Sequence, residues 1–432
     1  MFRNIIIALS AVALAGGIYI GWPIYGFFAH GGEVPLPFWG WVERPSEAAP
    51  GNQVAEPGYA GAGSRALAKL EAHRQKLGAP AMSAAVAING EVVWAGAVGW
   101  ADMAERKAAT PQNQFRIGST SKALTATALA RLVDKGVIDL DEPIGTYVND
   151  LPNEAWATIT PRMLASHMAG VPHYDQVEND PGKLEYAIMR KHFGDMRDAL
   201  SLFDDSPLLF EPGADFEYSS LGTVLLGATM EAAAGERYRD VVKLEVLDPI
   251  GMGETIVAPK RAGRGDDLAS FYLRRGERFR IWRPVDLSHR LPGGGWASSP
   301  SDLVRMGAGW LDADYITPDT RDQFWAPQRL FGGEVNEQDY AIGWRWREFE
   351  VEGLPAVRNA NHGGVSRGSQ SWLMVLPDYD MAIAVNINMR TDNFWDFGSA
   401  WEGVFRPFVE LAHSKNRKDD LKNLTTRPVL ED

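Results

Sequence analysis

The sequence predicts an α/β fold of the α+β type, in which a mostly antiparallel sheet is flanked by helices and carries an inserted helical subdomain. Two hairpin patterns support the sheet. The first joins residues 82–88 and 91–98 through Asn89-Gly90, the strongest short signal for a two-residue turn, and the second joins 371–376 and 381–387. Helical patterns dominate residues 160–247 between them. If the early and late strands share one sheet, the middle of the chain forms a helical lobe beside it.

Composition divides the chain into four segments. A helix capped by Ser64 and stopped at Gly78 is expected to open the folded part, and a second helix to run from Ser121 to Lys135. The expected units are an apolar segment (1–30), a Pro- and Gly-rich linker (31–63), a folded domain (64–415) with an α/β lobe (64–125 and 295–415) and a helical lobe (126–294), and a polar tail (416–432).

The apolar segment predicts a membrane anchor. No charge interrupts the run from Ile5 to Ala29, which is long enough to cross a hydrocarbon core of about 30 Å as a helix. A cleavable signal peptide is the alternative, because Ala13-Leu14-Ala15 resembles a small-residue cleavage site. With Arg3 before the run and Glu33 after it, the sequence of a bacterial protein would place the domain on the periplasmic side of the inner membrane.

Charge and residue counts exclude several classes of function. The 432 residues hold 43 Lys and Arg against 56 Asp and Glu, a formal net charge of −13, so nucleic acid is not an expected partner. There is no Cys, which removes thiolate metal sites and thiol nucleophiles. The eight His residues lack a recognisable metal-ligand spacing. We therefore expect no metal and no cofactor, and a small molecule or peptide as the substrate; the oligomeric state stays open.

The first chemical signal is a Ser three residues before a Lys. Ser119 and Lys122 lie at the start of the predicted Ala-rich helix, where this spacing puts both on one face. A Ser hydroxyl becomes a good nucleophile when a neighbouring base takes its proton, and a buried amine with a lowered pKa can do so. The helix N-terminus adds NH groups that can stabilise an oxyanion. Alone, the pattern also fits a helix cap followed by a solvated Lys.

Two further signals follow at long range. Glu217-Tyr218-Ser219-Ser220 precedes a second Ala-rich helix, so Tyr218 could relay a proton while Ser219 or Ser220 caps the helix. Asn361-His362-Gly363-Gly364-Val365 precedes the late hairpin, and two glycines after a potential cation would let a substrate lie close to an edge strand. Each alone also fits a packed Tyr or a Gly-rich turn.

Together, in this order, the three motifs resemble those of the penicillin-recognising serine hydrolases, especially the branch of class C β-lactamases and D-Ala-D-Ala peptidases. Residues 158–171 and 293–303 also look like that family. The resemblance implies a β-lactamase/transpeptidase-like fold and an acyl-enzyme mechanism. It implies Ser119 as nucleophile, Lys122 as its proton partner and Tyr218 as general base and later acid. His362 would replace the usual Lys, and the oxyanion hole would comprise the NH groups of Ser119 and Val365.

The resemblance also implies substrate contacts at Ser220, Gly363 and Gly364, and Arg367 could meet a substrate carboxylate, although a solvated Arg is the alternative. Ser220 stands where β-lactamases place an Asn. His362 is mostly neutral near pH 7, unlike a Lys. With these two residues the sequence is more similar to β-lactamase-fold esterases, D-amino-acid-specific peptidases and the mitochondrial β-lactamase-like protease.

We therefore expect hydrolysis of esters or of amides and peptides. A β-lactamase or D-Ala-D-Ala carboxypeptidase is the alternative activity, and a non-catalytic or filament-forming scaffold is the alternative of another class. Gly364-Val365-Ser366-Arg367-Gly368 spells the nucleophile elbow of α/β-hydrolases, but that elbow lies between a strand and a helix. Because two strands are expected after it, Ser366 is not the expected nucleophile.

Overall fold

The computed structural model describes residues 2–261 and 267–425. The helices are α1 (Phe2–Gly31), α2 (Ala60–Leu77), α3 (Ser121–Asp134), α4 (Pro161–Ala165), α5 (Asp180–Ile188), α6 (Met196–Leu200), α7 (Ser220–Ala234), α8 (Tyr238–Val242), α9 (Leu291–Gly294), α10 (Pro300–Gly309), α11 (Pro318–Trp325), α12 (Phe394–Gly398) and α13 (Ala400–Thr425). The strands are β1 (Trp41–Val42), β2 (Asn52–Ala55), β3 (Ala81–Ile88), β4 (Glu91–Asp102), β5 (Lys107–Ala108), β6 (Phe115–Arg116), β7 (Ile256–Val257), β8 (Tyr272–Arg275), β9 (Arg278–Ile281), β10 (Trp296–Ser298), β11 (Arg345–Phe349), β12 (Val357–Ser366), β13 (Ser369–Leu376) and β14 (Met381–Ile387).

The central sheet combines strands from both ends of the chain. Its order is β11-β12-β13-β14-β3-β4-β2, every neighbouring pair is antiparallel, and β5 also pairs with β4. The pairing of β14 with β3 joins the late strands to the early ones, with Ala384 opposite Ala85. The predicted antiparallel sheet with flanking helices is therefore confirmed.

Both predicted hairpins are present. Asn89 and Gly90 link β3 to β4 with φ angles of 53° and 83°. Two successive positive φ angles are what a type I′ turn requires, and they match the right-handed twist of the strands. The second hairpin pairs β13 with β14, with Leu376 opposite Met381.

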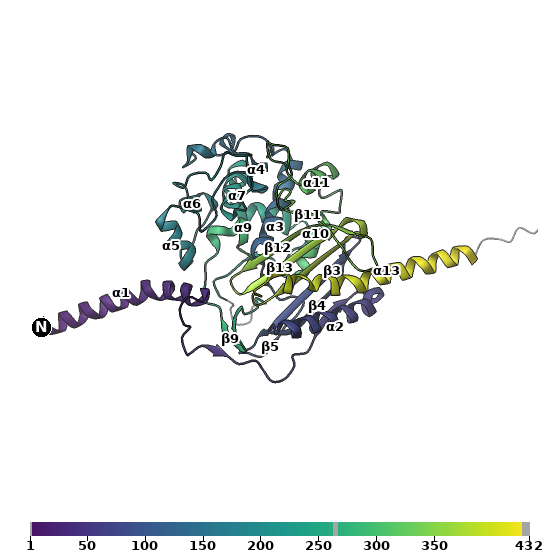
Figure 1. The fold of residues 1–432 in the computed structure, drawn as a ribbon, viewed down its shortest axis with the longest axis horizontal. Coiled ribbons are helices and arrows are strands. Elements are labelled where there is room, and N and C mark those ends of the chain that lie inside the picture. The colour runs from purple at the N-terminus through teal and green to yellow at the C-terminus, as the bar shows by residue number, and fades with distance from the viewer. Residues whose placement is uncertain (1, 262–266, 426–432) are drawn as a thin grey trace, which may run out of the picture.

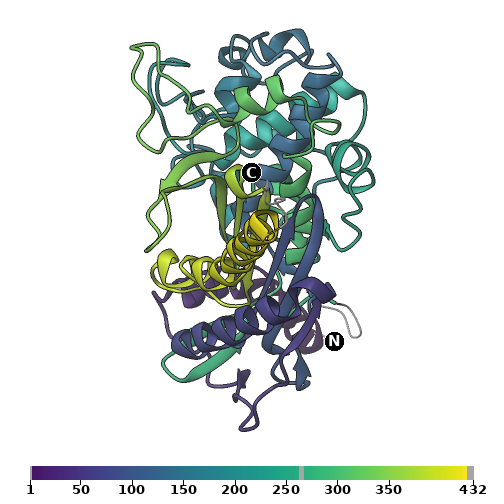
Figure 2. The ribbon, with the colours of Figure 1, turned by 90° about the vertical axis from the view of Figure 1, so that its right-hand side faces the viewer.

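Helices cover both faces of the sheet. On one face, α2 and α13 run side by side, contacting β4 and β14 respectively, as Figure 2 shows for the purple and yellow helices. On the other face, α10 contacts β3, β13 and β14, and the helical lobe built from α4 to α9 and α11 lies at the top of Figure 1. Because helices cover both faces, every residue of β13 and β14 is buried, rather than every second one. The main core lies between α3, α7, α10 and this face of the sheet.

Three segment boundaries differ from the sequence expectation. Ser64 lies inside α2, which begins four residues earlier after Tyr59, although Gly78 ends the helix as expected, with φ 64°. Residues 31–63 are not wholly a free linker, because β1 pairs with β9 and β2 adds an edge strand to the central sheet. These two strands are only two and four residues long, so their sequences show no hydrophobic repeat by which a strand could be predicted. The helix α13 continues to Thr425, inside the expected polar tail, whose last residues (426–432) lie outside the described residues.

The N-terminal helix α1 projects away from the domain over much of its length (Figure 1). Arg3–Gly31 is long and apolar enough to cross a membrane, with a mean hydropathy of 2.1 in its most apolar window.

Candidate active site

The predicted nucleophile lies in a tight turn against the edge of the sheet. Ser119 is part of the 3₁₀ turn Gly118–Thr120 that leads into α3. Gly118 has φ 53°, and a side chain there would come within 2.6 to 2.7 Å of the backbone of Val365 on β12. A side chain on Gly364 would come within 1.8 Å of the carbonyl oxygen of Ile117. The two glycines therefore allow the turn and β12 to touch, which brings the backbone of Val365 beside Ser119.

Lys122 is buried beside Ser119, and no carboxylate among the described residues pairs with it. Its Nζ lies 3.4 Å from Ser119 Oγ, and it donates to Ser220 Oγ at 2.8 Å and to the carbonyl oxygen of Gly293 at 3.1 Å. Burial lowers the pKa of Lys122 to about 7; the nearby Tyr174 opposes this, and the positive charges of Arg345 and Arg290 add to it. Near neutral pH about half of the Lys122 side chains would be neutral amines, which can accept a proton.

Tyr218 completes the contact between the first two motifs. The Ser119 side chain is close enough to its hydroxyl to influence its pKa, and the Nζ of Lys122 lies 4.6 Å from the centre of its ring. Burial raises the pKa of Tyr218, while Arg345 and the nearby Ser119 side chain oppose the rise. Tyr218 is therefore a neutral phenol near neutral pH, a form that can pass on a proton, and its expected role as general base and later acid stays a prediction.

Two histidines hold the start of α7, which positions Tyr218. Ser219 caps the helix by accepting from the NH of Gly222, as one of the two predicted capping serines. The NH of Ser219 donates to His167 Nδ1 at 3.3 Å, and the NH of Ser220 donates to His173 Nδ1 at 3.1 Å. Both rings must keep Nδ1 unprotonated to accept these bonds. Burial, followed by the charge of Lys122, lowers the pKa of His173 to about 4 and that of His167 well below its usual value.

His362, the potential cation of the third motif, is a buried imidazole whose two ring nitrogens bond within the protein. It is fully buried, its Nε2 is bonded to the hydroxyl of Tyr340 at 2.8 Å, and its Nδ1 is bonded to the carbonyl oxygen of Gly363 at 2.8 Å. Burial, and then the charges of Arg345 and Lys122, hold the pKa of His362 well below its usual value. The imidazole is neutral and both nitrogens are engaged, so His362 supports the strand instead of offering a charge.

The other residues expected to contact substrate are mostly engaged by the protein. Ser220 accepts the bond from Lys122. A side chain on Gly363 would meet Phe394 and Trp372 within 2.9 Å, so this glycine is required for packing. Arg367 is partly buried with its Nε unpaired, and burial together with Arg290, Arg283 and Arg390 lowers its pKa to about 9.

Arg345 supplies the positive charge that His362 lacks, and no sequence motif indicates it. From β11, its guanidinium lies 5.6 Å from the ring centre of Tyr218 and 4.9 Å from that of Tyr340, and it donates to Gln338. The register places Arg345 opposite Asn361, next to the third motif. An Arg-Trp-Arg run on a short strand is not a catalytic signature, so only the strand pairing could have identified this residue.

In the part of the chain that it describes, the structure does not support two other candidate sites, a nucleophile at Ser366 and a metal centre. Ser366 ends β12 and is followed by β13, so the GxSxG pattern joins two strands and not a strand and a helix. Across residues 2–261 and 267–425, no group of three or more His, Asp or Glu side chains is arranged to hold a metal ion.

Comparison with known proteins gives consistent similarities. A family model described as Beta-lactamase matches residues 67–398. The chain is 27% identical over 388 residues to the human "Serine beta-lactamase-like protein LACTB, mitochondrial", covering 71% of this chain and 70% of that protein. It is 25% identical over 320 residues to "Penicillin-binding protein 4*" of Bacillus subtilis (strain 168), covering 71% and 68%.

Solved structures agree on the fold. The D-amino acid amidase from Ochrobactrum anthropi SV3, complexed with L-phenylalanine, superposes with a TM-score of 0.66 at 22% identity, covering 82% of this chain and all of that one. The penicillin binding protein from Bacillus halodurans superposes with a TM-score of 0.63 at 20% identity, covering 78% and 99%. The predicted resemblance and the predicted β-lactamase/transpeptidase-like fold are confirmed.

Proposed function

Because the chain belongs to the beta-lactamase family, we propose that it is a membrane-tethered serine hydrolase that cleaves ester or amide and peptide bonds through an acyl-enzyme on Ser119. The observation that carries the proposal is the contact of one hydroxyl with two proton-transfer groups. Ser119 Oγ lies 3.4 Å from the Nζ of Lys122, and the Ser119 side chain is close enough to the Tyr218 hydroxyl to lower its pKa.

The reaction begins with the neutral form of Lys122. Its pKa of about 7 makes the amine available as a base near neutral pH, whereas the raised pKa of Tyr218 disfavours the phenolate. As Ser119 Oγ attacks the substrate carbonyl, its proton passes to Lys122 Nζ and the carbonyl oxygen becomes an oxyanion. The NH groups of Ser119 and Val365 are the proposed donors to that oxyanion, because the turn and β12 are in contact.

The leaving group then departs with a proton. The proton held by Lys122 returns through the Tyr218 hydroxyl to the leaving alcohol or amine as the tetrahedral intermediate collapses to an ester of Ser119. A water molecule attacks this acyl-enzyme, gives its proton to the same pair of groups, and releases the acid and the free Ser119 hydroxyl. No cofactor is needed to balance either half of the reaction.

The engaged state of two motif residues favours esters, amides and peptides over β-lactams. His362 is neutral and bonded to Tyr340, so it cannot attract a substrate carboxylate as an ammonium would. Ser220 accepts a bond from Lys122 and offers a single hydroxyl where β-lactamases place the amide of an Asn, which has both a donor and an acceptor group. Because similar proteins are named as a penicillin-binding protein and a D-amino acid amidase, a substrate panel should include β-lactams and D-amino acid amides.

We also propose that α1 anchors the domain at a membrane. The charge-free run and the flanking Arg3 and Glu33 favour the periplasmic side of the inner membrane in a bacterial host. Export followed by cleavage at a signal-peptide site is the alternative that N-terminal sequencing of the purified protein would reveal.

Labelling with a fluorophosphonate probe tests the nucleophile. We expect label on wild-type protein and on the Ser366→Ala control, no label on Ser119→Ala, and a loss of at least about a thousandfold in ester hydrolysis for Lys122→Ala, because nucleophile and base act as a unit. Label that persists on Ser119→Ala would overturn the assignment. Absence of both label and hydrolysis of short-chain nitrophenyl esters or D-amino-acid anilides from wild-type protein would favour a non-catalytic scaffold.

A further inference from the structure

The part of α1 that the domain leaves uncovered matches the thickness of a bilayer. All residues from Arg3 to Trp22 are exposed, whereas most of those from Pro23 to His30 are partly or fully buried against the domain. Twenty helical residues at 1.5 Å each span about 30 Å, the thickness of the hydrocarbon core. If α1 spans a membrane, the bilayer surface therefore lies near Trp22, and the domain surface around α1 lies among the lipid headgroups.

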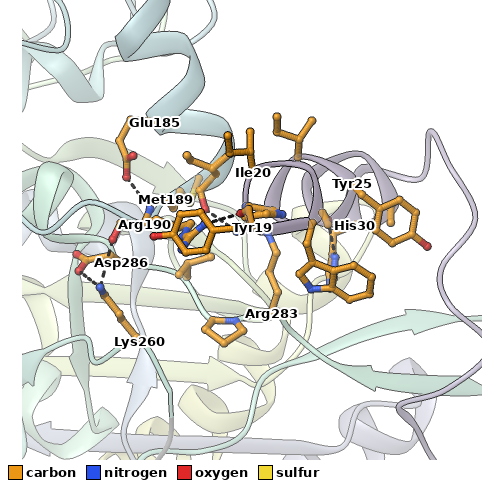
Figure 3. Close-up of a pocket in the computed structure, with 18 of the residues that line it drawn as sticks. Tyr19, Ile20, Tyr25, His30, Glu185, Met189, Arg190, Lys260, Arg283 and Asp286 are labelled. Atoms are coloured by element: carbon orange, nitrogen blue, oxygen red, sulfur yellow. Dashed lines mark hydrogen bonds and ion pairs between the residues drawn. The ribbon is translucent and has the colours of Figure 1, made fainter. Parts of the chain in front are cut away.

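A cavity of about 1030 Å³ lies at this level, between α1 and the domain. Figure 3 shows Tyr19, Ile20 and His30 of α1 on one side, and Glu185, Arg190 and Lys260 on the other. Its walls come from the last half of α1, the end of α5 with the residues after it, and the segment that follows β9. The cavity thus straddles the expected boundary between hydrocarbon and headgroups.

The charges around this cavity are mainly positive. Both of its carboxylates are already engaged: Glu185 accepts from the backbone NH groups of Arg190 and Lys191, and Asp286 pairs with Lys260 at 3.0 Å. Among the described residues, the remaining lining Lys and Arg side chains (Arg190, Lys191, Arg261, Arg280 and Arg283) form no salt bridge with a carboxylate. An anion bound here would compensate a positive excess on a protein whose net charge is −13.

Arg190 and Arg283 are the two cations whose positions best suit binding of an anion in this cavity. Arg190 donates to the carbonyl oxygen of Tyr19 at 2.9 Å, and its guanidinium lies 4.0 Å from the centre of the Tyr19 ring, so it sits where α1 meets the domain. Arg283 donates to the carbonyl oxygens of Ile188 and Ala187 at the end of α5. Burial lowers the pKa of Arg283 to about 10, which shows that its charge is poorly solvated and would be favoured by a bound anion.

The opposite wall of the cavity is apolar. Ile18, Ile20 and Trp22 on α1 line it and are 50% to 64% exposed. From the match between this apolar wall, the basic rim and the depth of the cavity, we propose that the groove between α1 and the α5 end binds an anionic phospholipid. The phosphate would lie against Arg190, Lys191 and Arg283, and an acyl chain would follow α1 into the bilayer.

Lipid selectivity of the full chain tests this site. Full-length protein in a nonionic detergent would be titrated with phosphatidylglycerol or phosphatidylcholine carrying the same acyl chains, and bound lipid counted by native mass spectrometry. We expect phosphatidylglycerol to bind at least tenfold more tightly. The double variant Arg190→Gln with Lys191→Gln should lose roughly twenty-five-fold in affinity for phosphatidylglycerol only, because each of the two cations near a membrane surface contributes on the order of a factor of five.

A matched control removes the same charge elsewhere. Arg237→Gln with Arg239→Gln, two exposed cations at α8, should bind both lipids as wild type does. Hydrolysis of a soluble ester should be unchanged in both double variants, which verifies folding. Because Arg190 contacts α1, the single variant Lys191→Gln serves as a second test; it should show a smaller loss in the same direction. Equal binding of the two lipids, or equal losses in the two double variants, would overturn the site.

Two further measurements separate a lipid site from a site for free phosphate and from membrane attachment alone. Inorganic phosphate in millimolar excess should not displace phosphatidylglycerol, since the acyl chain supplies most of the apolar contact; displacement would refute a lipid site. The site rests on the proposed anchoring by α1, which flotation of the protein with vesicles measures separately. A protein that floats but shows no lipid preference refutes the lipid site alone, whereas a protein that does not float refutes the anchoring and the site together.

Discussion

Replacement of Arg345 by Gln should move the acidic limb of the pH–activity profile to higher pH. The Nζ of Lys122 lies 4.6 Å from the ring centre of Tyr218, and the guanidinium of Arg345 lies 5.6 Å from the same point, so the two cations are at most about 10 Å apart. At an effective dielectric constant near 20, two unit charges about 10 Å apart repel by about 1.7 kcal/mol, or roughly one pKa unit. Because this repulsion disfavours the charged amine, its removal raises the pKa of Lys122 from about 7 toward 8.

The assay is kcat/KM for a short-chain nitrophenyl ester between pH 5 and 10. Activity requires the neutral amine, so Arg345→Gln should lose up to about tenfold near pH 6 and little near pH 9. Arg347→Gln removes the same charge two residues further along β11 and should shift the limb by much less. An unmoved limb in Arg345→Gln, or one that moves to lower pH, would refute the assignment of Lys122 as the titrating base.

Three other changes test the geometry of the site. Ser220→Ala should move the same acidic limb to lower pH by roughly half a unit, because it removes an acceptor that stabilises the charged form of Lys122; a pH titration of kcat/KM measures the shift. Gly364→Ala should reduce ester hydrolysis more than about a hundredfold by pushing β12 from the nucleophile turn, whereas Gly253→Ala, which has open space around it, should match wild type in the same assay. Tyr340→Phe should lower the free energy of unfolding in urea by about 1 to 3 kcal/mol, since it leaves a buried imidazole nitrogen without its donor; an unchanged midpoint would contradict the role of this bond.

Local patterns predicted the parts of the fold that local chemistry determines. Asn89-Gly90 specifies its turn through two positive φ angles, and the hairpin formed as expected. The Ala-rich helix after Ser119 begins at Ser121, as predicted, and ends at Asp134, one residue before its expected end. The likeness of the three motifs to one family then implied the pairing of Ser119 and Lys122 with Tyr218, which lies far from them in the sequence but beside Lys122 in the fold.

The missed features depend on contacts between distant segments. His167 and His173 accept from the start of α7, yet nothing in their own neighbourhood indicates that they face Ser219 and Ser220. The strand β2 is recognisable only by its pairing with β4, because its four residues have no useful periodicity. Side-chain burial likewise follows from packing, so the sequence could identify His362 but not its full burial or its bond to Tyr340.

The positive charge in the site comes from Arg345 on β11 and not from His362 on β12, and this determines which groups titrate. A substrate-facing imidazole would gain its charge as pH falls, whereas His362 is held neutral by burial and the nearby cations. The positive charge beside Tyr218 comes from Arg345 on the adjacent strand β11, and a guanidinium keeps its charge across the range in which enzymes work. The contribution of Arg345 to the electrostatic field at Tyr218 is therefore constant near neutral pH, whereas that of Lys122 changes with its charge. A single ionisation in the acidic limb, assigned to Lys122, is the expected consequence; a second ionisation that disappears in His362→Gln would show that the imidazole titrates after all.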